Sequence, residues 1–369
     1  MPSNDLESLK ATMTWLYQSV VHGRGGSSSH YDLLRGRWLD PFPETTGYII
    51  PTLFDYGSFS AEPRYPDAAI RITDWLGTVQ LPNGGCIQGS YREGENKQEA
   101  IVFNTGQNIF GFLRTWSETG DTKYLDHAKK AGDFLVQSTD EKGTWNRNLH
   151  RGLKHTINTR TSWALLELYL QIPDPSYREV AIANLDWTLE QQTETGWFRH
   201  GTSRPGGLPN THFLSYTCEG LIQSWRHMKD KKYLEGARRT ADTLLSIYRE
   251  KGELYCFWDE QWKNHGRYNP FSKGKFSCLT GNAQISVVWM WLFEETGDRT
   301  YLDAACRMIG FIRSTQDLTS RNDGIRGGIN GSHPVYGGYS IFKYPNWAAK
   351  FFADALMLKI KLTRHEGTS

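Results

Sequence analysis

Among the residues whose side chains could move protons, four stand out by their position in the sequence: Glu44, His155, His212 and Glu219. Each of them stands at the start of an apolar segment or within one. Two carboxyl groups can act as general acid and general base in one reaction, and imidazole changes its charge near neutral pH. We therefore treat these four residues as candidate catalytic groups.

Each candidate also has a purely structural explanation. Glu219 could form a buried ion pair with Arg160, which would tie two helices together. The positive end of a helix would favour a carboxylate at Glu44 without any catalytic role. His155 and His212 could each cap a backbone group. The sequence leaves these alternatives open.

A larger set of side chains is suited to binding a polar ligand. Amides hydrogen-bond to hydroxyl groups, arginine forks onto carboxylates, and aromatic rings offer flat apolar faces. The predicted binding residues are Gln107, Asn158, Arg160, Trp163, Tyr216, Asn282, Gln284, Tyr344, Asn346 and Trp347. Aromatic residues make up 13% of the chain. Some stand among Gly, Asn, Arg and His in long loops, where we expect stacking platforms for sugar rings: Trp145, Trp197, Phe198, Trp258, Trp262, Tyr336 and Tyr339.

The elements that position these residues come from an internal repeat. A tyrosine heads five amphipathic segments, at Tyr65, Tyr124, Tyr177, Tyr233 and Tyr301. Apolar residues recur in them at three- and four-residue spacing, which predicts helices with one polar face. Two of them follow a Gly-Asp turn, whose glycine ends one helix and whose carboxylate favours the start of the next. With a sixth helix at about residues 6–21, they form the predicted outer layer.

Between the outer helices lie segments that are apolar nearly all round, which is typical of buried helices. Their predicted starts are near Glu44, Asn104, Asn158, His212, Thr280 and Tyr344. Six outer and six inner helices predict an all-α, closed (α/α)6 barrel of hairpins in which no repeat needs a cap. We expect a single domain over residues 1–369.

The loops predict where the ligand binds. Connections from inner to outer helices are short, whereas those from outer to inner helices are long and rich in glycine. Long ordered loops are usually functional, and the N-terminal ends of helices attract anions. We therefore expect the largest concavity at the N-terminal ends of the inner helices, and an acidic ligand in it. Its predicted lining is Glu44, Gln107, Arg160, Tyr216, Glu219 and Asn282.

Composition excludes several other classes of function. The net charge of +2 is too small to indicate nucleic-acid binding, and no apolar run is long enough to span a membrane. The first residues lack the features of a secretory signal, and five scattered cysteines fit neither a disulfide framework nor a zinc site. No phosphate-, dinucleotide- or metal-binding motif is present. We expect a cytoplasmic protein without metal or other cofactor; the oligomeric state is not predictable.

Several motifs resemble a poorly characterised six-hairpin family that is associated with bacterial exopolysaccharide biosynthesis clusters. They include the segment from Phe42 to Leu53, Asn104-Thr-Gly-Gln, and the segments that begin at Asn158, Cys278 and Tyr344. The resemblance covers nearly the whole chain. It implies a toroid of the six-hairpin glycosidase type and a polysaccharide context, but no particular reaction.

Together these features predict a carbohydrate-active enzyme, a glycoside hydrolase that acts on a uronate-containing saccharide. Glu219 would be its acid or base, Glu44 the partner carboxylate, and Arg160, His155 and His212 would engage the sugar. The alternatives are a polysaccharide lyase or a uronate C5-epimerase on the same fold. A glycan-binding scaffold without catalysis is the alternative from another class.

Overall fold

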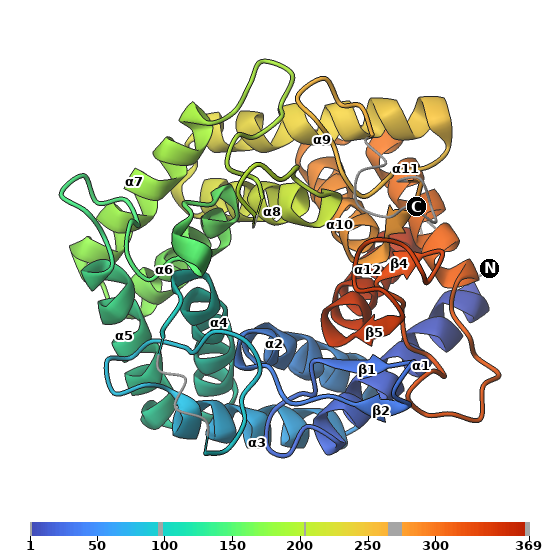
Figure 1. Ribbon diagram of the computed structural model, residues 1–369, viewed down its shortest axis with the longest axis horizontal. Coiled ribbons are helices and arrows are strands. Elements are labelled where there is room, and N and C mark those ends of the chain that lie inside the picture. Colours follow the sequence, from blue (N-terminus) through green and yellow to red (C-terminus); the bar gives the residue numbers. More distant parts are fainter. Residues whose placement is uncertain (1, 95–98, 203, 265–274, 366–369) are drawn as a thin grey trace.

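The computed structural model describes residues 2–94, 99–202, 204–264 and 275–365, so parts of three of the long loops lie outside it. Within these residues, twelve α-helices form two concentric rings (Figure 1). The inner ring consists of α2 (Pro43–Ser60), α4 (Val102–Thr119), α6 (Thr159–Gln171), α8 (Thr211–Met228), α10 (Leu279–Thr296) and α12 (Asn346–His365). The outer ring consists of α1 (Pro2–Val21), α3 (Arg64–Val79), α5 (Thr122–Gln137), α7 (Pro175–Glu190), α9 (Lys231–Lys251) and α11 (Arg299–Ser314).

The predicted (α/α)6 barrel is confirmed. Each inner helix begins within two residues of its predicted start. The ring is closed because α12 packs against both α1 and α2, so the last hairpin contacts the first.

The tyrosines that head four of the outer helices bond to the preceding repeat. Four tyrosines donate a hydrogen bond to an aspartate one repeat upstream: Tyr124 to Asp74, Tyr177 to Asp133, Tyr233 to Asp186 and Tyr301 to Asp242. The repeating Tyr and Asp of the sequence are therefore the two halves of one contact between neighbouring outer helices. We call each such pair a tyrosine–aspartate latch.

The short turns on one face of the ring supply the helix caps. Asp121, Asp174, Asp230 and Asp298 precede α5, α7, α9 and α11, and each side chain accepts a backbone N–H in the first turn of its helix. Such a cap satisfies a donor that has no partner within the helix. The acidic residue in these turns has the role that the sequence predicted.

Inner helices approach one another closely through glycines near their N-termini. A Cβ on Gly47 would lie 2.7 Å from the Cα of Asn108, and one on Gly281 would lie 2.5 Å from the backbone nitrogen of His212. A Cβ on Gly106 would meet Thr161 at 2.7 Å. These glycines let α2 contact α4, α4 contact α6 and α10 contact α8 at close range near the N-terminal ends of the inner helices.

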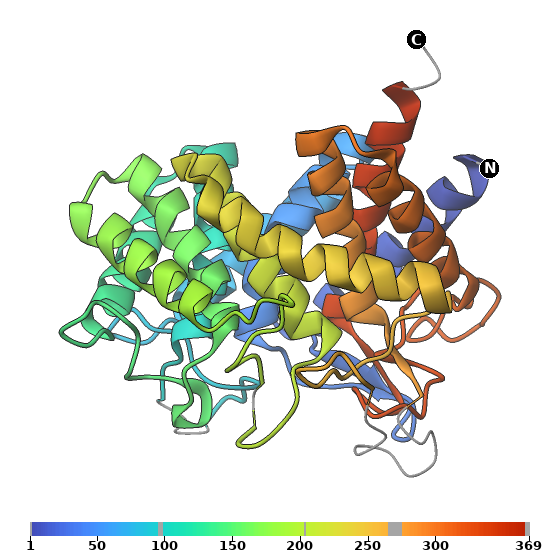
Figure 2. The ribbon, with the colours of Figure 1, turned by 90° about the horizontal axis from the view of Figure 1, so that it is seen from above.

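The long connections gather on the other face, where the inner helices begin (Figure 2). Two small sheets order part of them. One contains β1 (His30–Asp32), β2 (Arg37–Trp38) and β5 (Lys343–Pro345) in the order β2-β1-β5, and the other pairs β3 (Ser277–Cys278) with β4 (Ser332–His333). The short 3-10 turns η1 (His150–Gly152) and η2 (Thr156–Asn158) precede α6. In the described chain, no helix is long and apolar enough to cross a membrane.

Candidate functional site

A cavity of about 210 Å³, which we call the mouth cavity, lies at the N-terminal ends of the inner helices. Six of the predicted site residues line it: Glu44, His155, Asn158, His212, Tyr216 and Trp347. The sequence singled out Asn104 and Tyr339 less firmly, and they also line it, together with Phe42, Thr45, Tyr48, Ile101, Phe103, Leu149, His150, Ile157 and Phe213. At roughly 30 Å³ per water, this volume equals about seven waters. It therefore suits one sugar ring rather than an oligosaccharide.

Glu44 is the only carboxylate among the described residues that line the mouth cavity. It stands in the first turn of α2, where Pro43 begins the helix. No hydrogen bond or ion pair joins its carboxyl to another described residue. Its surface is partly accessible through the cavity, yet it lies deep in the ring, and burial raises its pKa to about 8 against the weaker effect of Arg160. Glu44 is therefore mostly protonated at neutral pH.

His155 is buried in the wall of the same cavity. Neither ring nitrogen has a hydrogen-bond partner among the described residues. Burial is the largest cause that lowers its pKa, to about 4, and nearby His150 adds to this effect. A buried imidazole without partners is costly, because each ring nitrogen has lost its contact with water. The ring is thus neutral, and both of its nitrogens are buried without a partner among the described residues.

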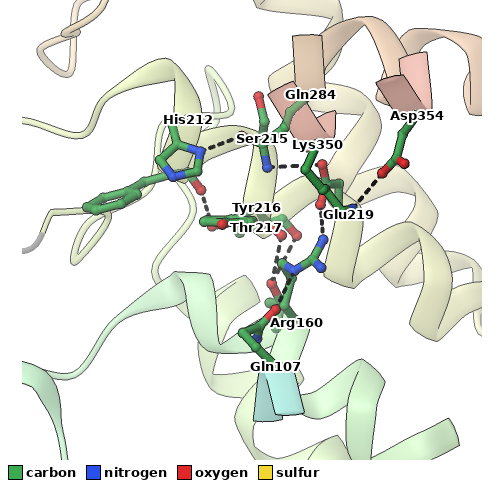
Figure 3. Close-up of polar contacts among 12 residues, drawn as sticks. Gln107, Arg160, His212, Ser215, Tyr216, Thr217, Glu219, Gln284, Lys350 and Asp354 are labelled. Carbon is green, nitrogen blue, oxygen red and sulfur yellow. Dashed lines mark hydrogen bonds and ion pairs between the residues drawn. The ribbon is translucent and has the colours of Figure 1, made fainter. Parts of the chain in front are cut away.

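His212 has one ring nitrogen fixed by a chain of polar contacts (Figure 3). Its Nδ1 contacts the amide oxygen of Gln284, and the amide nitrogen of Gln284 donates to Oε1 of Glu219 at 3.1 Å. A carboxylate only accepts, so the Gln284 nitrogen must face Glu219 and its oxygen must face His212. The proton of a neutral His212 therefore lies on Nδ1, and Nε2 keeps its lone pair. Burial lowers the pKa of His212 to about 3.

Glu219 forms a buried ion pair with Arg160, the contact that its structural explanation required. Burial raises the pKa of the Glu219 carboxyl, while Arg160, Lys350 and Gln284 oppose that rise. Because arginine keeps its proton in proteins, a neutral Glu219 would leave a positive charge buried without a partner. The pair is therefore charged. Gln107 completes it by accepting a hydrogen bond from Nε of Arg160 at 3.0 Å.

Aromatic rings surround the Arg160 guanidinium. Its carbon lies 5.0 Å from the ring centre of Tyr216 and 5.2 Å from that of Trp163, and three more rings lie within 5.9 Å: Tyr48, Phe110 and Phe351. Such contacts stabilise a cation that has left water. This aromatic cage and the ion pair lie deeper along the axis of the ring than the mouth cavity.

A second cavity, of about 870 Å³, opens on the face with the short turns, and we call it the rear cavity. Arg160, Trp163 and Glu219 line it, together with residues of α2, α10 and α12. The prediction that one concavity is lined by Glu44, Gln107, Arg160, Tyr216, Glu219 and Asn282 is therefore wrong. Side chains of the ion pair and its aromatic cage fill the centre of the ring, so Glu44 and Tyr216 line one cavity, whereas Arg160 and Glu219 line the other.

The remaining predicted residues stand apart from both linings. Gln107 and Gln284 act through Arg160 and His212. Asn346 donates to Ser27, Ser28 and Thr45, which ties the start of α12 to α2 and to the loop after α1. Tyr344 pairs with Tyr31 in the sheet of β1 and β5. Asn282 is fully buried with both amide atoms unpaired among the described residues.

Most of the loop aromatics pack in the core rather than forming platforms. Trp145, Phe198 and Trp258 are at most 1% exposed. The indole of Trp145 donates to Leu135, and that of Trp258 donates to Thr211, so both fasten a long loop to a helix. Of the seven, Tyr339 lines the mouth cavity. Loop residues have no periodicity that separates packing from ligand contact, which is why the prediction failed.

Eleven of the lining residues were absent from the predicted site, and Tyr48 and His150 are the two of them whose side chains matter most here; the sequence held a signal for Tyr48. Tyr48 follows Glu44 by one helical turn, so it shares the inward face of α2. The helical spacing from Glu44 could have identified it. His150 belongs to η1, a turn that no repeat marks, and its Nδ1 is 2.7 Å from the amide nitrogen of Gln88. Among the described residues, no cluster of three or more His, Cys, Asp or Glu side chains could hold a metal ion.

Comparison with known proteins extends the fold assignment. No protein-family profile matches the chain, and no curated protein is similar to it in sequence. Solved structures do match over nearly its whole length. An unsaturated glucuronyl hydrolase specific for heparin superposes with a TM-score of 0.77 at 16% identity, and covers 99% of both chains.

Two further structures belong to enzymes of two kinds. An unsaturated glucuronyl hydrolase of a Bacillus species, responsible for the degradation of glycosaminoglycan, gives a TM-score of 0.73 at 17% identity over 98% of this chain and 97% of its own. Cellobiose 2-epimerase from Bacillus thermoamylovorans gives 0.75 at 13% identity over 96% and 98%. At these identities the likeness establishes a shared fold, the six-hairpin toroid.

Proposed function

We propose that this chain is a glycoside hydrolase that acts on an acidic saccharide, and that the mouth cavity binds the sugar residue that reacts. The observation that carries the proposal is Glu44, a carboxyl group without a partner, protonated near neutral pH, inside a cavity lined by aromatic rings. An acid with a pKa near the working pH is an efficient proton donor. The unsaturated glucuronyl hydrolases that share the fold support the same reading.

An acidic sugar is favoured by the electrostatics of the mouth cavity. The inner helices direct their N-termini toward it, and the positive ends of helix dipoles attract anions. Glu44 contributes little negative charge because it is protonated. A uronate would add a carboxylate next to Glu44 and stabilise its protonated form further, so substrate binding and the acidic role of Glu44 reinforce each other.

The substrate class can be narrowed by counting carboxyl groups. Hydrolysis of an ordinary glycoside uses two carboxyl groups, but Glu219 is engaged by Arg160 and lines the rear cavity. An unsaturated uronide requires only one proton donor, because its C4–C5 double bond is an enol ether. Protonation at C4 gives an oxocarbenium ion, water adds at C5, and the resulting hemiketal opens and releases the alcohol. The proton that water loses returns to the Glu44 carboxylate.

Two neutral imidazoles in the same cavity favour epimerisation as a second candidate. Nε2 of His212 has a lone pair, and both nitrogens of His155 lack partners among the described residues. Removal of a proton on one face of a carbon and its return on the other needs two such groups. The cellobiose 2-epimerase that shares the fold is consistent with this candidate.

One incubation separates the two reactions. We expect an unsaturated glucuronyl disaccharide to lose its ultraviolet absorbance in the presence of the enzyme, because hydration removes the conjugated double bond. Glu44→Gln should abolish that loss, whereas Glu179→Gln on the exposed face of α7 should not. Unchanged absorbance together with deuterium uptake from heavy water into a saturated saccharide would identify an epimerase instead. Binding without either change would indicate a glycan-binding scaffold and overturn the enzymatic proposal. The exopolysaccharide setting is part of this proposal and rests on the sequence motifs alone.

A further inference from the structure

A hollow of about 980 Å³ lies beside the mouth cavity on the face with the long loops, and we call it the arginine crevice. Four separate segments form its walls. The loop after α1 contributes Arg24, the hairpin of β1 and β2 contributes Arg35 and Arg37, and the loop after α3 contributes Arg92. The loop after α11 contributes residues 322–324. Segments distant in sequence thus bring four guanidinium groups to one hollow.

The positive charge of the crevice is only partly compensated. Its two aspartates are both engaged: Asp40 pairs with Arg92 at 2.5 Å, and Asp323 pairs with Arg326, outside the lining. Arg35 is 3.6 Å from Asp32. Neither Arg24 nor Arg37 has an ion pair or side-chain hydrogen bond within the described part of the chain, and both side chains are exposed.

Arg24 also occupies an unusual backbone position. Its φ is 49°, in the left-handed region that glycine adopts at least cost, and three of its neighbours are Gly23, Gly25 and Gly26. Arginine has a higher conformational energy than glycine at this backbone position. Such strain concentrates at functional positions.

The floor of the crevice is a fixed aromatic surface. The ring of Trp38 lies 4.9 Å from that of Trp15 and 5.5 Å from that of Tyr31, and His22 stacks on it at 5.4 Å with an angle of 12°. Asn322 donates to the Tyr31 hydroxyl at 2.7 Å. This packing holds the floor in place, so the arginines surround a fixed aromatic cluster rather than projecting from a loose loop.

The crevice and the mouth cavity are neighbours. His30 lines the crevice, and its ring meets that of Trp347, a residue of the mouth cavity, edge to face at 5.5 Å. Pro41 lines one hollow and Phe42, the next residue, lines the other. Because the mouth cavity has room for one sugar ring, the next residues of a saccharide must extend beyond it, and the crevice lies beside that path.

We propose that the arginine crevice is an anion-binding subsite that takes a carboxylate or sulfate on a sugar beyond the reacting residue, with Arg24 and Arg37 as its principal ligands. This inference rests on the proposed function for its substrate class. Binding of an anionic saccharide at the crevice does not itself require turnover, so it can be measured separately.

The test uses isothermal titration of three proteins that all carry Glu44→Gln, so that the probes are not turned over. They are this variant alone, the same protein with the double substitution Arg24→Gln and Arg37→Gln (the double variant), and the same protein with the control substitution Arg71→Gln on the exposed face of α3. The probes are an unsaturated glucuronyl disaccharide with one sulfate group, its unsulfated counterpart, and inorganic phosphate. Exposed ion pairs contribute ~0.2–1 kcal/mol each, so we expect Kd for the sulfated probe to rise about 2- to 27-fold in the double variant. The unsulfated probe should change less, the control should not change, and added salt should reduce the difference.

Equal affinities of the double variant and the control for the sulfated probe would overturn the proposal. Binding of inorganic phosphate that is lost in the double variant, with no change for either saccharide, would also overturn it, because the crevice would then serve a phosphate compound. If the saccharide binds as expected but the wild-type protein never turns it over, the proposed function fails and the subsite stands.

Discussion

Glu44 is poised as an acid because nothing in the described chain bonds to its carboxyl and burial opposes its ionisation. Glutamine has nearly the same shape but no proton to give. We expect Glu44→Gln to lower turnover by ~10²–10⁴, the usual size of general acid–base effects. Because the protonated glutamate and glutamine are both neutral, the melting temperature at pH 6 should change little. Turnover at the wild-type rate would remove Glu44 from the mechanism.

The activity of the wild-type protein should depend on pH through the ionisation of Glu44. As pH rises through about 8, Glu44 loses its proton, and turnover should fall with it. A pH–rate profile measured on the wild type checks this expectation.

The buried Arg160–Glu219 ion pair leads us to a prediction about the free energy of unfolding. Glu219→Gln would leave Arg160 as a buried charge without its partner, and we expect it to reduce the free energy of unfolding by about 3–5 kcal/mol. Replacing both residues with apolar ones, as in Arg160→Met with Glu219→Leu, should restore much of that loss because no unpaired charge remains. Urea unfolding of the single and double variants measures both effects. A Glu219→Gln protein of normal stability but without activity would favour the catalytic role instead.

At the residue scale, sequence reasoning could identify partners only where a repeat gave a register. Glu219 and Gln284 occupy equivalent positions of α8 and α10, and they do contact each other. The choice between catalysis and ion pairing at Glu219 depended on the position of Arg160, one helix away, which the sequence could suggest but not measure. Tyr339 and His150 lie in loops without a register, so their place in the mouth cavity depended on the folded structure.

At the scale of elements, glycines determine how closely the inner helices pack. A Cβ on Gly281 would lie 2.5 Å from the backbone nitrogen of His212 and 2.8 Å from the carbonyl carbon of Thr211. We expect Gly281→Ala to force α10 away from α8, to cost about 1–3 kcal/mol as overpacking does, and to lower turnover by moving His212.

Gly310→Ala is the matched control for that substitution. Gly310 lies inside α11, and a Cβ there would have no atom within 4 Å. Alanine should therefore stabilise the protein by about 0.4–1 kcal/mol, since it restricts the unfolded chain more than glycine does. Urea unfolding and turnover are measured on both variants, and equal behaviour of the two would contradict the packing role of Gly281.

The elements were predictable because their signals are local and repeated. Amphipathic spacing, Gly-Asp turns and apolar inner segments each specify a helix or its end, and six copies reinforce one another. The sequence showed the recurring Tyr and Asp of the tyrosine–aspartate latches but not that they bond to each other, since the two partners lie one repeat apart. Closure of the ring follows from the number of hairpins. The division of the central space into a mouth cavity and a rear cavity could not be predicted from the sequence, because it depends on which side chains fill the centre of the ring.

At the scale of the whole molecule, buried titratable groups of opposite kinds should limit stability on both sides of pH 6.5. Burial lowers the pKa of His30 and His155 to about 4 and that of His212 to about 3, from 6.5. Below pH 6.5 the unfolded chain takes up protons that the folded chain refuses, so stability falls as the pH falls.

Glu44 has the opposite effect on the pH dependence of stability. Its pKa is raised from 4.5 to about 8, so between these values the folded protein keeps a proton that the unfolded chain releases, and stability falls as the pH rises. Below pH 6.5 the three histidines outweigh this single group, whereas above about pH 7 too few imidazoles of the unfolded chain remain protonated to do so. We therefore expect maximal stability near pH 6.5 and a loss of at most ~1.4 kcal/mol per pH unit from there to pH 8. Urea unfolding at a series of pH values measures the curve. Glu44→Gln should remove the loss above pH 6.5 while Glu179→Gln keeps it, and an unchanged slope in Glu44→Gln would show that another group titrates there.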